Sequence, residues 1–125
     1  MSTRIFVFGS NRSGRHGRGA ALFARQRRGA VYGQGEGLQG GSYAIPTKDE
    51  RIQTLPLGEI EAHVRRFLAY AADHPTMEFE VTPIGCGLAG YTPPEIAPMF
   101  RGAPANCVLP REFLEVLARD DEPTP

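Results

Sequence analysis

Glycine is the residue that most constrains how this chain of 125 residues can fold, because its glycines are not evenly spread. Ten of the fifteen glycines lie between Gly9 and Gly41. A glycine excess confined to one stretch indicates loops whose backbone adopts conformations that other residues avoid. It does not indicate general disorder, since 41% of the residues are hydrophobic and 22% are charged, as in ordinary globular proteins.

The length predicts one domain, residues 1–119, followed by a frayed acidic tail at 120–125. The formal net charge is zero, but seven arginines precede the first acidic residue, Glu36. A basic first third can attract an anionic ligand such as a phosphate or a nucleic acid. It can equally form a solvated helix face, and the sequence leaves both interpretations open.

The remaining bulk features exclude several classes of protein. Cys86 and Cys107 are the two cysteines; one disulfide is possible on their count alone, and they lack the spacing of a zinc site, so we expect no metal. We also expect no cofactor. We see no signal-peptide pattern and no apolar run near the roughly 18–20 residues of a membrane span. We therefore expect a cytoplasmic monomer with free thiols and no membrane partner.

Hydrophobic patterns predict alternating strands and helices. Short apolar runs predict strands at 5–8, 42–45, 79–84 and 106–109. Apolar spacing and breaker residues predict helices at 20–29, 57–74, 92–100 and 110–119. Pro46 is expected to stop the second strand, and 30–41 is predicted as a loop with a brief strand at Val31 and Tyr32. This alternation predicts an α/β fold with a mostly parallel central sheet and helices on both faces.

The same patterns predict which side chains face the core. The last helix is expected to turn Phe113, Leu114 and Leu117 inward. His63 is expected on the polar side of its helix and His74 at the end of that helix. We therefore predict that both histidines are surface groups.

Three loops leave the carboxyl ends of predicted strands, at 9–17, 46–51 and 85–91. Ligands of open α/β sheets bind at that edge, so we expect the functional site there. The first loop precedes a helix whose free N–H groups suit a phosphate, and the Asn11 amide can bond a ribose hydroxyl. Its candidate ligand-binding residues are Gly9, Ser10, Asn11, His16, Gly17, Gly19 and Ala20. The alternative is a turn that simply needs glycine.

The third of these loops can form an anion-binding nest of backbone amides, because it has three glycines within six residues. Its candidate residues are Ile84, Gly85, Cys86, Gly87, Leu88, Ala89, Gly90 and Tyr91. Together the two glycine loops can clamp a pyrophosphate from opposite sides. Tyr91 can stack on a ligand ring or pack at the helix entry, and Cys86 can be a nucleophile or a small filler. Packing and filling are the favoured interpretations.

Lys48 is the single lysine of the chain, against thirteen arginines, and it follows a predicted strand beside Thr47 and Asp49. A lysine amine can lose its proton and act as a base or nucleophile, which a guanidinium cannot do. Asp49 can orient it, and Arg15 or Arg18 can lower its pKa if the loops converge. Lys48 and Asp49 are the catalytic candidates, with an exposed Lys–Asp pair as the alternative.

Three segments of the chain, in this order, resemble the macro domain family: 11–23, 43–48 and 84–88. The similarity is to the branch of terminal ADP-ribose protein glycohydrolases and ADP-ribose 1''-phosphate phosphatases, and to a subgroup of small phage and bacterial proteins. The resemblance implies a three-layer α/β/α fold, ADP-ribose binding, and Lys48 in the position of a reactive lysine. In the glycohydrolase branch an aspartate follows the glycine-cysteine-glycine-leucine segment, whereas Ala89 stands there in this chain.

These observations lead to three functional hypotheses. The first is a hydrolase that binds ADP-ribose or a derivative and cleaves ADP-ribosyl linkages on a protein, a nucleic acid or a small molecule. The second is a non-catalytic reader or sponge for ADP-ribose or a cyclic derivative. The third is a nucleic-acid-binding module that uses the basic first third. It is the least favoured, because the sequence does not interleave basic and aromatic residues.

Overall fold

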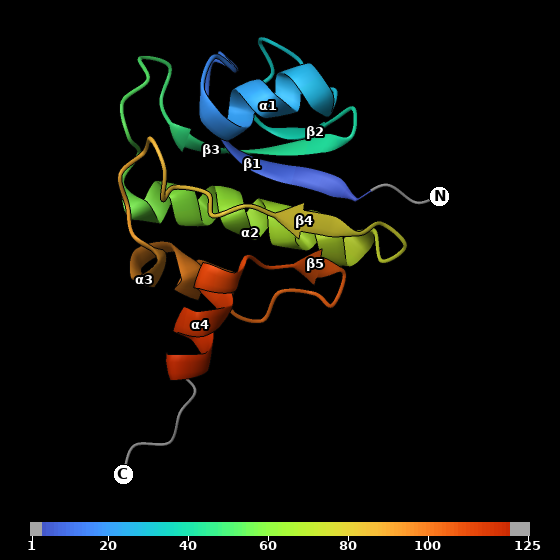
Figure 1. Cartoon of the computed structure of the whole chain (residues 1–125), viewed down its shortest axis with the longest axis vertical. Helices are drawn as coiled ribbons and strands as arrows, with labels where there is room; N and C mark the ends of the chain where they lie inside the picture. The colour runs from blue at the N-terminus through green and yellow to red at the C-terminus, as the bar shows by residue number, and fades with distance from the viewer. Residues whose placement is uncertain (1–3, 121–125) are drawn as a thin grey trace.

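One five-stranded sheet forms the centre of the computed structural model, which describes residues 4–120 (Figure 1). Its strands are β1 (Ile5–Asn11), β2 (Gly37–Gln39), β3 (Ser42–Lys48), β4 (Phe79–Val81) and β5 (Cys107–Val108). The helices are α1 (Gly19–Arg27), α2 (Leu57–Asp73), α3 (Pro93–Ile96) and α4 (Arg111–Asp120), with the 3-10 helix η1 (Ala97–Phe100). The predicted α/β class is confirmed.

The strand order is β2-β3-β1-β4-β5. β1 pairs in parallel with both β3 and β4, β4 pairs in parallel with β5, and the edge strand β2 runs antiparallel to β3. The predicted mostly parallel sheet is therefore also confirmed. The chain passes from β1 to β3 on one side and then crosses to β4 on the other. Such a reversal of strand order marks the place where open α/β sheets bind ligands, outside the carboxyl end of β1.

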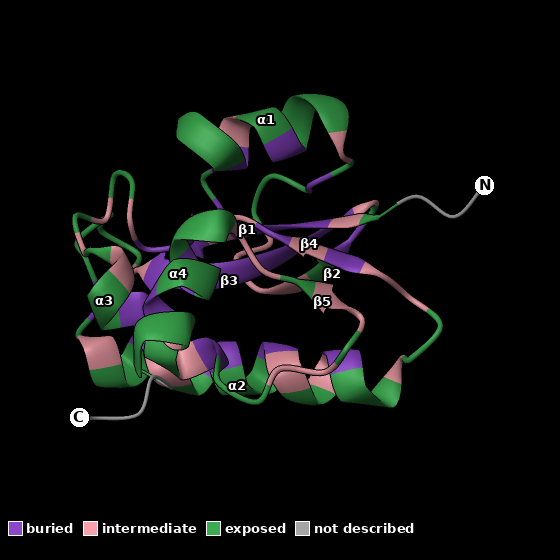
Figure 2. Ribbon diagram, turned by 60° about the horizontal axis from the view of Figure 1, so that its bottom comes forward, coloured by how far each residue is buried: buried purple, intermediate pink, exposed green. Residues whose placement is uncertain are grey.

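Helices lie on both faces of the sheet (Figure 2). Successive residues of a strand point to opposite faces, so an apolar strand such as β1 has side chains to bury on each face. On one face Phe6 and Phe8 pack with Ala21 and Ala24 of α1. On the other face Val7 belongs to a larger core that includes side chains of α2, η1 and α4. The small alanines let α1 lie close to β1, which brings the start of this helix near the carboxyl end of the strand.

Helix α2 supplies more buried residues to the larger core than any other helix within residues 4–120. Its residues Ile60, Val64 and Phe67 are fully buried at spacings of four and three. Burial of a side chain of this size contributes roughly 2 kcal/mol to stability. The helix ends at Asp73, and the Asn106 side chain donates a hydrogen bond to the carbonyl oxygen of Ala71 at 3.0 Å.

Two predictions are wrong: the brief strand in the segment before β3, and the residue at which β3 ends. No strand forms at Val31 and Tyr32, which are exposed; the strand of this segment is β2, six residues later. Pro46 does not stop β3, which continues to Lys48. A register shift in β1 lies next to its pairing with Pro46, and such an irregularity accommodates a residue without a backbone N–H.

The predicted strand at 79–84 is too long. β4 ends at Val81 because Pro83 has no N–H to continue the ladder. The backbone N–H and the hydroxyl of Thr82 both donate to the carbonyl oxygen of Val7, at 3.1 and 2.7 Å. Residues 82–84 therefore belong to the loop at the end of the strand.

Two side-chain orientations also differ from the prediction. Leu114 is 52% exposed, because Phe113 and Val116, three positions apart, form the inward face of α4. His63 is buried instead of exposed, because Glu36 lies beside α2, with its Oε2 2.8 Å from Nδ1 of His63.

At its end, α4 includes Asp120, which was predicted to belong to the tail; residues 121–125 lie outside the described residues. His74, half-buried, stacks on the ring of Tyr70 with 4.0 Å between the ring centroids. Between residues 4 and 120 there is no helix with both the length and the apolar character needed to cross a bilayer.

Candidate functional site

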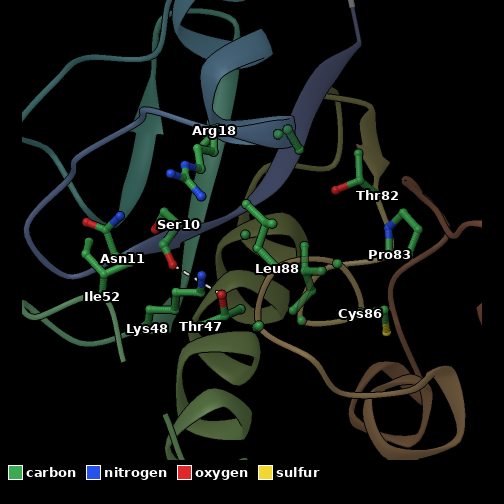
Figure 3. A pocket seen from close by; sticks show the side chains of 18 of the residues that line it. Ser10, Asn11, Arg18, Thr47, Lys48, Ile52, Thr82, Pro83, Cys86 and Leu88 are labelled. Atoms are coloured by element: carbon green, nitrogen blue, oxygen red, sulfur yellow. Dashed lines mark hydrogen bonds between the residues drawn. The ribbon is translucent and has the colours of Figure 1, made fainter. Parts of the chain in front are cut away.

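A cavity of about 660 Å³ opens where β1, β3 and β4 end (Figure 3). This volume is typical of pockets that hold small-molecule ligands. Its walls come from the loop between β1 and α1, from the end of β3 and the turn after it, and from the loop after β4. The three predicted segments therefore come together at one edge of the sheet, but the predicted loops begin too early: residues 9–11 belong to β1 and residues 46–48 to β3.

Most of the predicted site residues line this cavity. They are Gly9, Ser10, Asn11, Gly17, Gly19, Ala20, Thr47, Lys48, Ile84, Gly85, Cys86, Gly87, Leu88 and Ala89. The predicted residues that do not line it are His16, Asp49, Gly90 and Tyr91. The lining residues that were not predicted as ligand contacts are Arg15, Arg18, Ala21, Ile52, Thr82, Pro83, Pro93 and Glu112.

Helix α1 points its N-terminus at the cavity. Arg18 is the N-cap residue, and no side chain caps the helix. The N–H groups of Gly19, Ala20 and Ala21 have no acceptor within the helix, because they belong to its first turn. All three residues line the cavity. The free N–H groups and the positive end of the helix dipole favour an anion at this position.

The charged side chains of the cavity are mostly cationic. Arg15, Arg18 and Lys48 line it, against one carboxylate, that of Glu112. Within residues 4–120, none of the three cations forms an ion pair with a carboxylate. Figure 3 shows Arg18 at the start of α1 and Lys48 at the end of β3. The cavity therefore carries a net positive charge that attracts anionic ligands.

The loop after β4 faces the start of α1 across the cavity. Gly85 has φ +76°, and a Cβ there would lie 2.9 Å from Cδ1 of Ile96, so the loop needs glycine at this position. Gly87 has no such constraint, since its Cβ would meet no atom within 4 Å. Leu88 reaches across the cavity: a Cβ on Gly19 would lie 3.6 Å from its Cδ1. The two glycine loops thus lie opposite each other.

Lys48 and Asp49, the predicted catalytic pair, have different surroundings. Lys48 lines the cavity next to Thr47, whose hydroxyl donates to the carbonyl oxygen of Ser10 at 3.2 Å. Asp49 instead organises the turn after β3. Its Oδ1 accepts the backbone N–H groups of residues 51 and 53 at 2.8 and 3.0 Å. These bonds, that from Gln53 foremost, lower the pKa of Asp49. The structure therefore does not bring Asp49 to the cavity.

The turn held by Asp49 places Ile52 on the wall of the cavity. Ile52 has φ +63°, and it is the one residue other than glycine with positive φ within residues 4–120. This conformation is strained for a β-branched residue. The side chain is 38% exposed, so burial in the core does not account for the strain.

His16 belongs to the first loop but does not line the cavity. It is fully buried, and its ring packs edge-on against Phe8 at 5.2 Å between centroids. Its Nε2 is 3.0 Å from the carbonyl oxygen of Gln34 and 3.1 Å from Oε1 of Gln39. Because Nε2 faces two acceptor oxygens, it carries the proton. His16 therefore joins the first loop to the glycine-rich segment before β3.

Tyr91 and Cys86 fit the interpretations favoured from the sequence. The Tyr91 hydroxyl donates to the carbonyl oxygen of Leu55 at 2.8 Å, which makes it a packing residue. The pKa of Cys86 is raised to about 11, mainly because burial disfavours the thiolate and further because Glu112 and Glu95 are nearby. Its thiol is therefore neutral at physiological pH, and a nucleophilic role is disfavoured. Both cysteines are free.

Some of the lining residues that were not predicted could have been recognised from the sequence, and others could not. Thr82 and Pro83 follow β4 directly, and a strand ending at Val81 would have placed them in the loop. Glu112 comes from α4, and no local pattern connects that helix with the glycine loops.

In the described part of the chain, no three metal-ligating side chains gather into a possible metal site. Comparison of the chain with protein-family models, with curated proteins and with solved structures returned no match. The geometry and charge of the cavity are therefore the basis for a functional assignment.

Proposed function

We propose that this chain binds ADP-ribose or a close derivative in the cavity at the ends of β1, β3 and β4. The observation that carries the proposal is the uncapped N-terminus of α1, which meets the cavity together with Arg15, Arg18 and Lys48. A phosphate or pyrophosphate suits such a site, because backbone N–H groups and guanidinium groups donate charge-assisted hydrogen bonds to its oxygens.

In this proposal the pyrophosphate lies between the start of α1 and the loop after β4. A Cβ on Gly17 or on Gly87 would meet no protein atom within 4 Å, so both backbones leave room for a ligand. Beyond the two glycine loops, the cavity is lined by Lys48 at the end of β3 and by Pro93 of α3 and Glu112 of α4. It thus offers space on both sides of a pyrophosphate, as a ligand with a nucleoside at one end and a ribose at the other requires.

We further propose that the architecture is the three-layer α/β/α arrangement of macro domains. Support comes from the mostly parallel sheet and from the positions of α1 and α2 on opposite faces. The three segments that resemble the family, 11–23, 43–48 and 84–88, also all contribute residues to one cavity.

Hydrolysis of an ADP-ribosyl linkage is the second candidate function, favoured by the unpaired Lys48 on the cavity wall. In that reaction the oxygen of a water molecule bonds to the anomeric carbon of the distal ribose while the bond to the acceptor group breaks. The water gives one proton to a base, and the acceptor leaves with a proton that the base or the solvent returns to it. A neutral Lys48 amine can take the proton of the water. Ala89 stands at the position of the family's aspartate and Asp49 is outside the cavity, so Lys48 would act without either partner.

Calorimetric titration tests the binding proposal directly. We expect ADP-ribose to bind with saturation and AMP to bind more weakly, because AMP lacks the second phosphate and the distal ribose. Absence of ADP-ribose binding by the folded protein would overturn the proposal. If ADP-ribose binds but no ADP-ribosyl linkage on protein, nucleic acid or small molecule is cleaved, the protein is a non-catalytic reader.

A further inference from the structure

A second cationic surface, separate from the cavity, lies on α1 and the residues that follow it. Arg25, Arg27 and Arg28 form its charged part. Within residues 4–120, none of these guanidinium groups pairs with a carboxylate, whereas Arg4 and Arg12 pair with Glu78 and Glu59. The sequence has no acidic residue in α1 or before it, so only a carboxylate distant in the sequence could pair with these arginines. The chain as a whole is neutral, so the positive charge on α1 is balanced by negative charge elsewhere on the molecule.

Exposed aromatic rings accompany these arginines. The Arg25 guanidinium lies over the ring of Tyr32, 4.8 Å from its centroid, and Tyr32 is 56% exposed. The Arg28 guanidinium lies 5.7 Å from the centroid of Phe23, which is 42% exposed. The sequence disfavours a nucleic-acid surface, because basic and aromatic residues do not alternate along the chain. The fold brings them together, since Tyr32 lies beyond the end of α1 and still contacts its side.

We propose that this surface, defined by Phe23, Arg25, Arg27, Arg28 and Tyr32, binds single-stranded nucleic acid. Unpaired guanidinium groups attract the phosphates of a polyanion, and exposed rings held beside them offer faces on which bases stack. Bases of a duplex are already stacked and cannot use those faces. An acidic polypeptide would satisfy the arginines but has no planar bases for Phe23 and Tyr32.

The geometry of α1 sets how such a strand lies. Phe23 and Arg25 are two positions apart, so their side chains leave the helix in nearly opposite directions, and the ring of Tyr32 lies beside the Arg25 guanidinium. A helix with its side chains is about 10 Å across. A strand that crosses α1 therefore reaches the two rings with nucleotides that are not adjacent. In Figures 1 and 2, α1 lies at the outside of the molecule, which leaves it accessible to such a strand.

The test is fluorescence anisotropy of a labelled 20-nucleotide oligothymidine titrated with the full chain at several salt concentrations. We expect saturable binding that weakens as salt rises. The variant Arg25→Gln/Arg27→Gln/Arg28→Gln is expected to lose at least tenfold in affinity and to reduce the slope of log affinity against log salt by about 2, at roughly 0.7 per phosphate contact. Tyr32→Ala is expected to lose roughly tenfold through stacking.

The matched control is Arg65→Gln/Arg111→Gln/Arg119→Gln, which removes the same charge from α2 and α4 and should leave affinity within twofold of wild type. Because Arg28 also lies over the Phe6 ring, Arg25→Gln/Arg27→Gln serves as a second variant that keeps this contact. No binding by the folded wild type, equal losses in both triple variants, equal affinity for a 20-base-pair duplex, or equal competition by polyglutamate would each overturn the proposal.

Discussion

The side chain of Asn11 bonds with both backbone groups of Arg15: Nδ2 donates to the carbonyl oxygen at 2.9 Å, and Oδ1 accepts from the N–H at 2.9 Å. Oδ1 also accepts the hydroxyl of Ser13 at 2.8 Å. The amide therefore fixes the loop that places Arg15 at the cavity. One N–H of Nδ2 remains for a ligand, so the main role of Asn11 is to shape the loop, and a bond with a ribose hydroxyl would be secondary.

Asn11→Ala is accordingly expected to lower the free energy of unfolding by roughly 1–3 kcal/mol, because it leaves loop donors and acceptors without partners at a buried position. Urea denaturation measures the change. Ser13→Ala, which removes one of the bonds, is the control and should cost less. An Asn11→Ala protein as stable as wild type would show that water replaces the amide at no cost.

Ile52→Asn is expected to raise the free energy of unfolding by roughly 1 kcal/mol, since asparagine adopts the left-handed conformation more readily than isoleucine. It is also expected to weaken ADP-ribose binding, because the apolar side chain lines the cavity. Ile52→Val keeps both the strain and the apolar surface and should change neither quantity much. Lower stability of Ile52→Asn in thermal unfolding would mean that packing of Ile52 outweighs its strain.

The regular elements could be predicted because their information is local. Ile60, Val64 and Phe67 recur at helical spacing, and all three are buried in α2. The Glu95 side chain, three positions after Thr92, accepts the backbone N–H of Thr92 at 3.0 Å at the start of α3, as in a capping box. Such positions are fixed by periodicity and by bonds within one turn, so a single stretch of sequence is enough to place them.

The roles of individual glycines could not be predicted, because they depend on segments distant in the sequence. A Cβ on Gly35 would lie 2.5 Å from the carbonyl oxygens of Asn11 and Arg12, so this glycine allows two backbones to pack together. Gly87 lies in open space at the cavity. In the sequence, Gly35 and Gly87 look alike, because each is a glycine in a glycine-rich segment. Glu112 illustrates the same limit, because only the packing of α4 brings it to the cavity.

Cys86 is expected to react slowly with iodoacetamide at pH 8 and to accelerate until the pH approaches its pKa of about 11. Burial disfavours the reactive thiolate, so the rate should not level near pH 9 as for an ordinary thiol. The measurement uses Cys107→Ser, because burial also raises the pKa of Cys107 to about 11. A plateau near pH 9 would contradict the expected burial.

The raised pKa of Cys86 also makes the stability of the fold depend on pH. A thiol whose pKa is higher in the folded than in the unfolded chain holds its proton more tightly when folded. Its contribution is complete below pH 9 and is lost as the pH rises toward 11. Cys86→Ser should therefore unfold with a weaker pH dependence than wild type across this window.

Gly87→Val is expected to abolish ADP-ribose binding and to leave the fold intact. The added side chain enters the space proposed for the pyrophosphate, where it meets no protein atom, and the φ of Gly87 is not in the left-handed region. Gly58→Val is the matched control, because Gly58 also lies in open space but outside the cavity. Unchanged affinity in a folded Gly87→Val protein would exclude the clamp between the glycine loops.

Lys48→Arg tests the hydrolytic candidate, because it keeps the positive charge of the cavity and removes the amine that can lose a proton. If Lys48 takes the proton of the attacking water, the variant should bind ADP-ribose within a few-fold of wild type and release ADP-ribose from a modified protein or nucleic acid at least 100-fold more slowly. Binding and release are measured on the same preparation. The control is Asp49→Asn, which should preserve turnover, because the Asp49 carboxylate bonds to the turn after β3 and does not line the cavity. Full turnover in Lys48→Arg would show that the Lys48 amine takes no part in the reaction. Loss of turnover in Asp49→Asn at unchanged stability would show that the Asp49 carboxylate does take part.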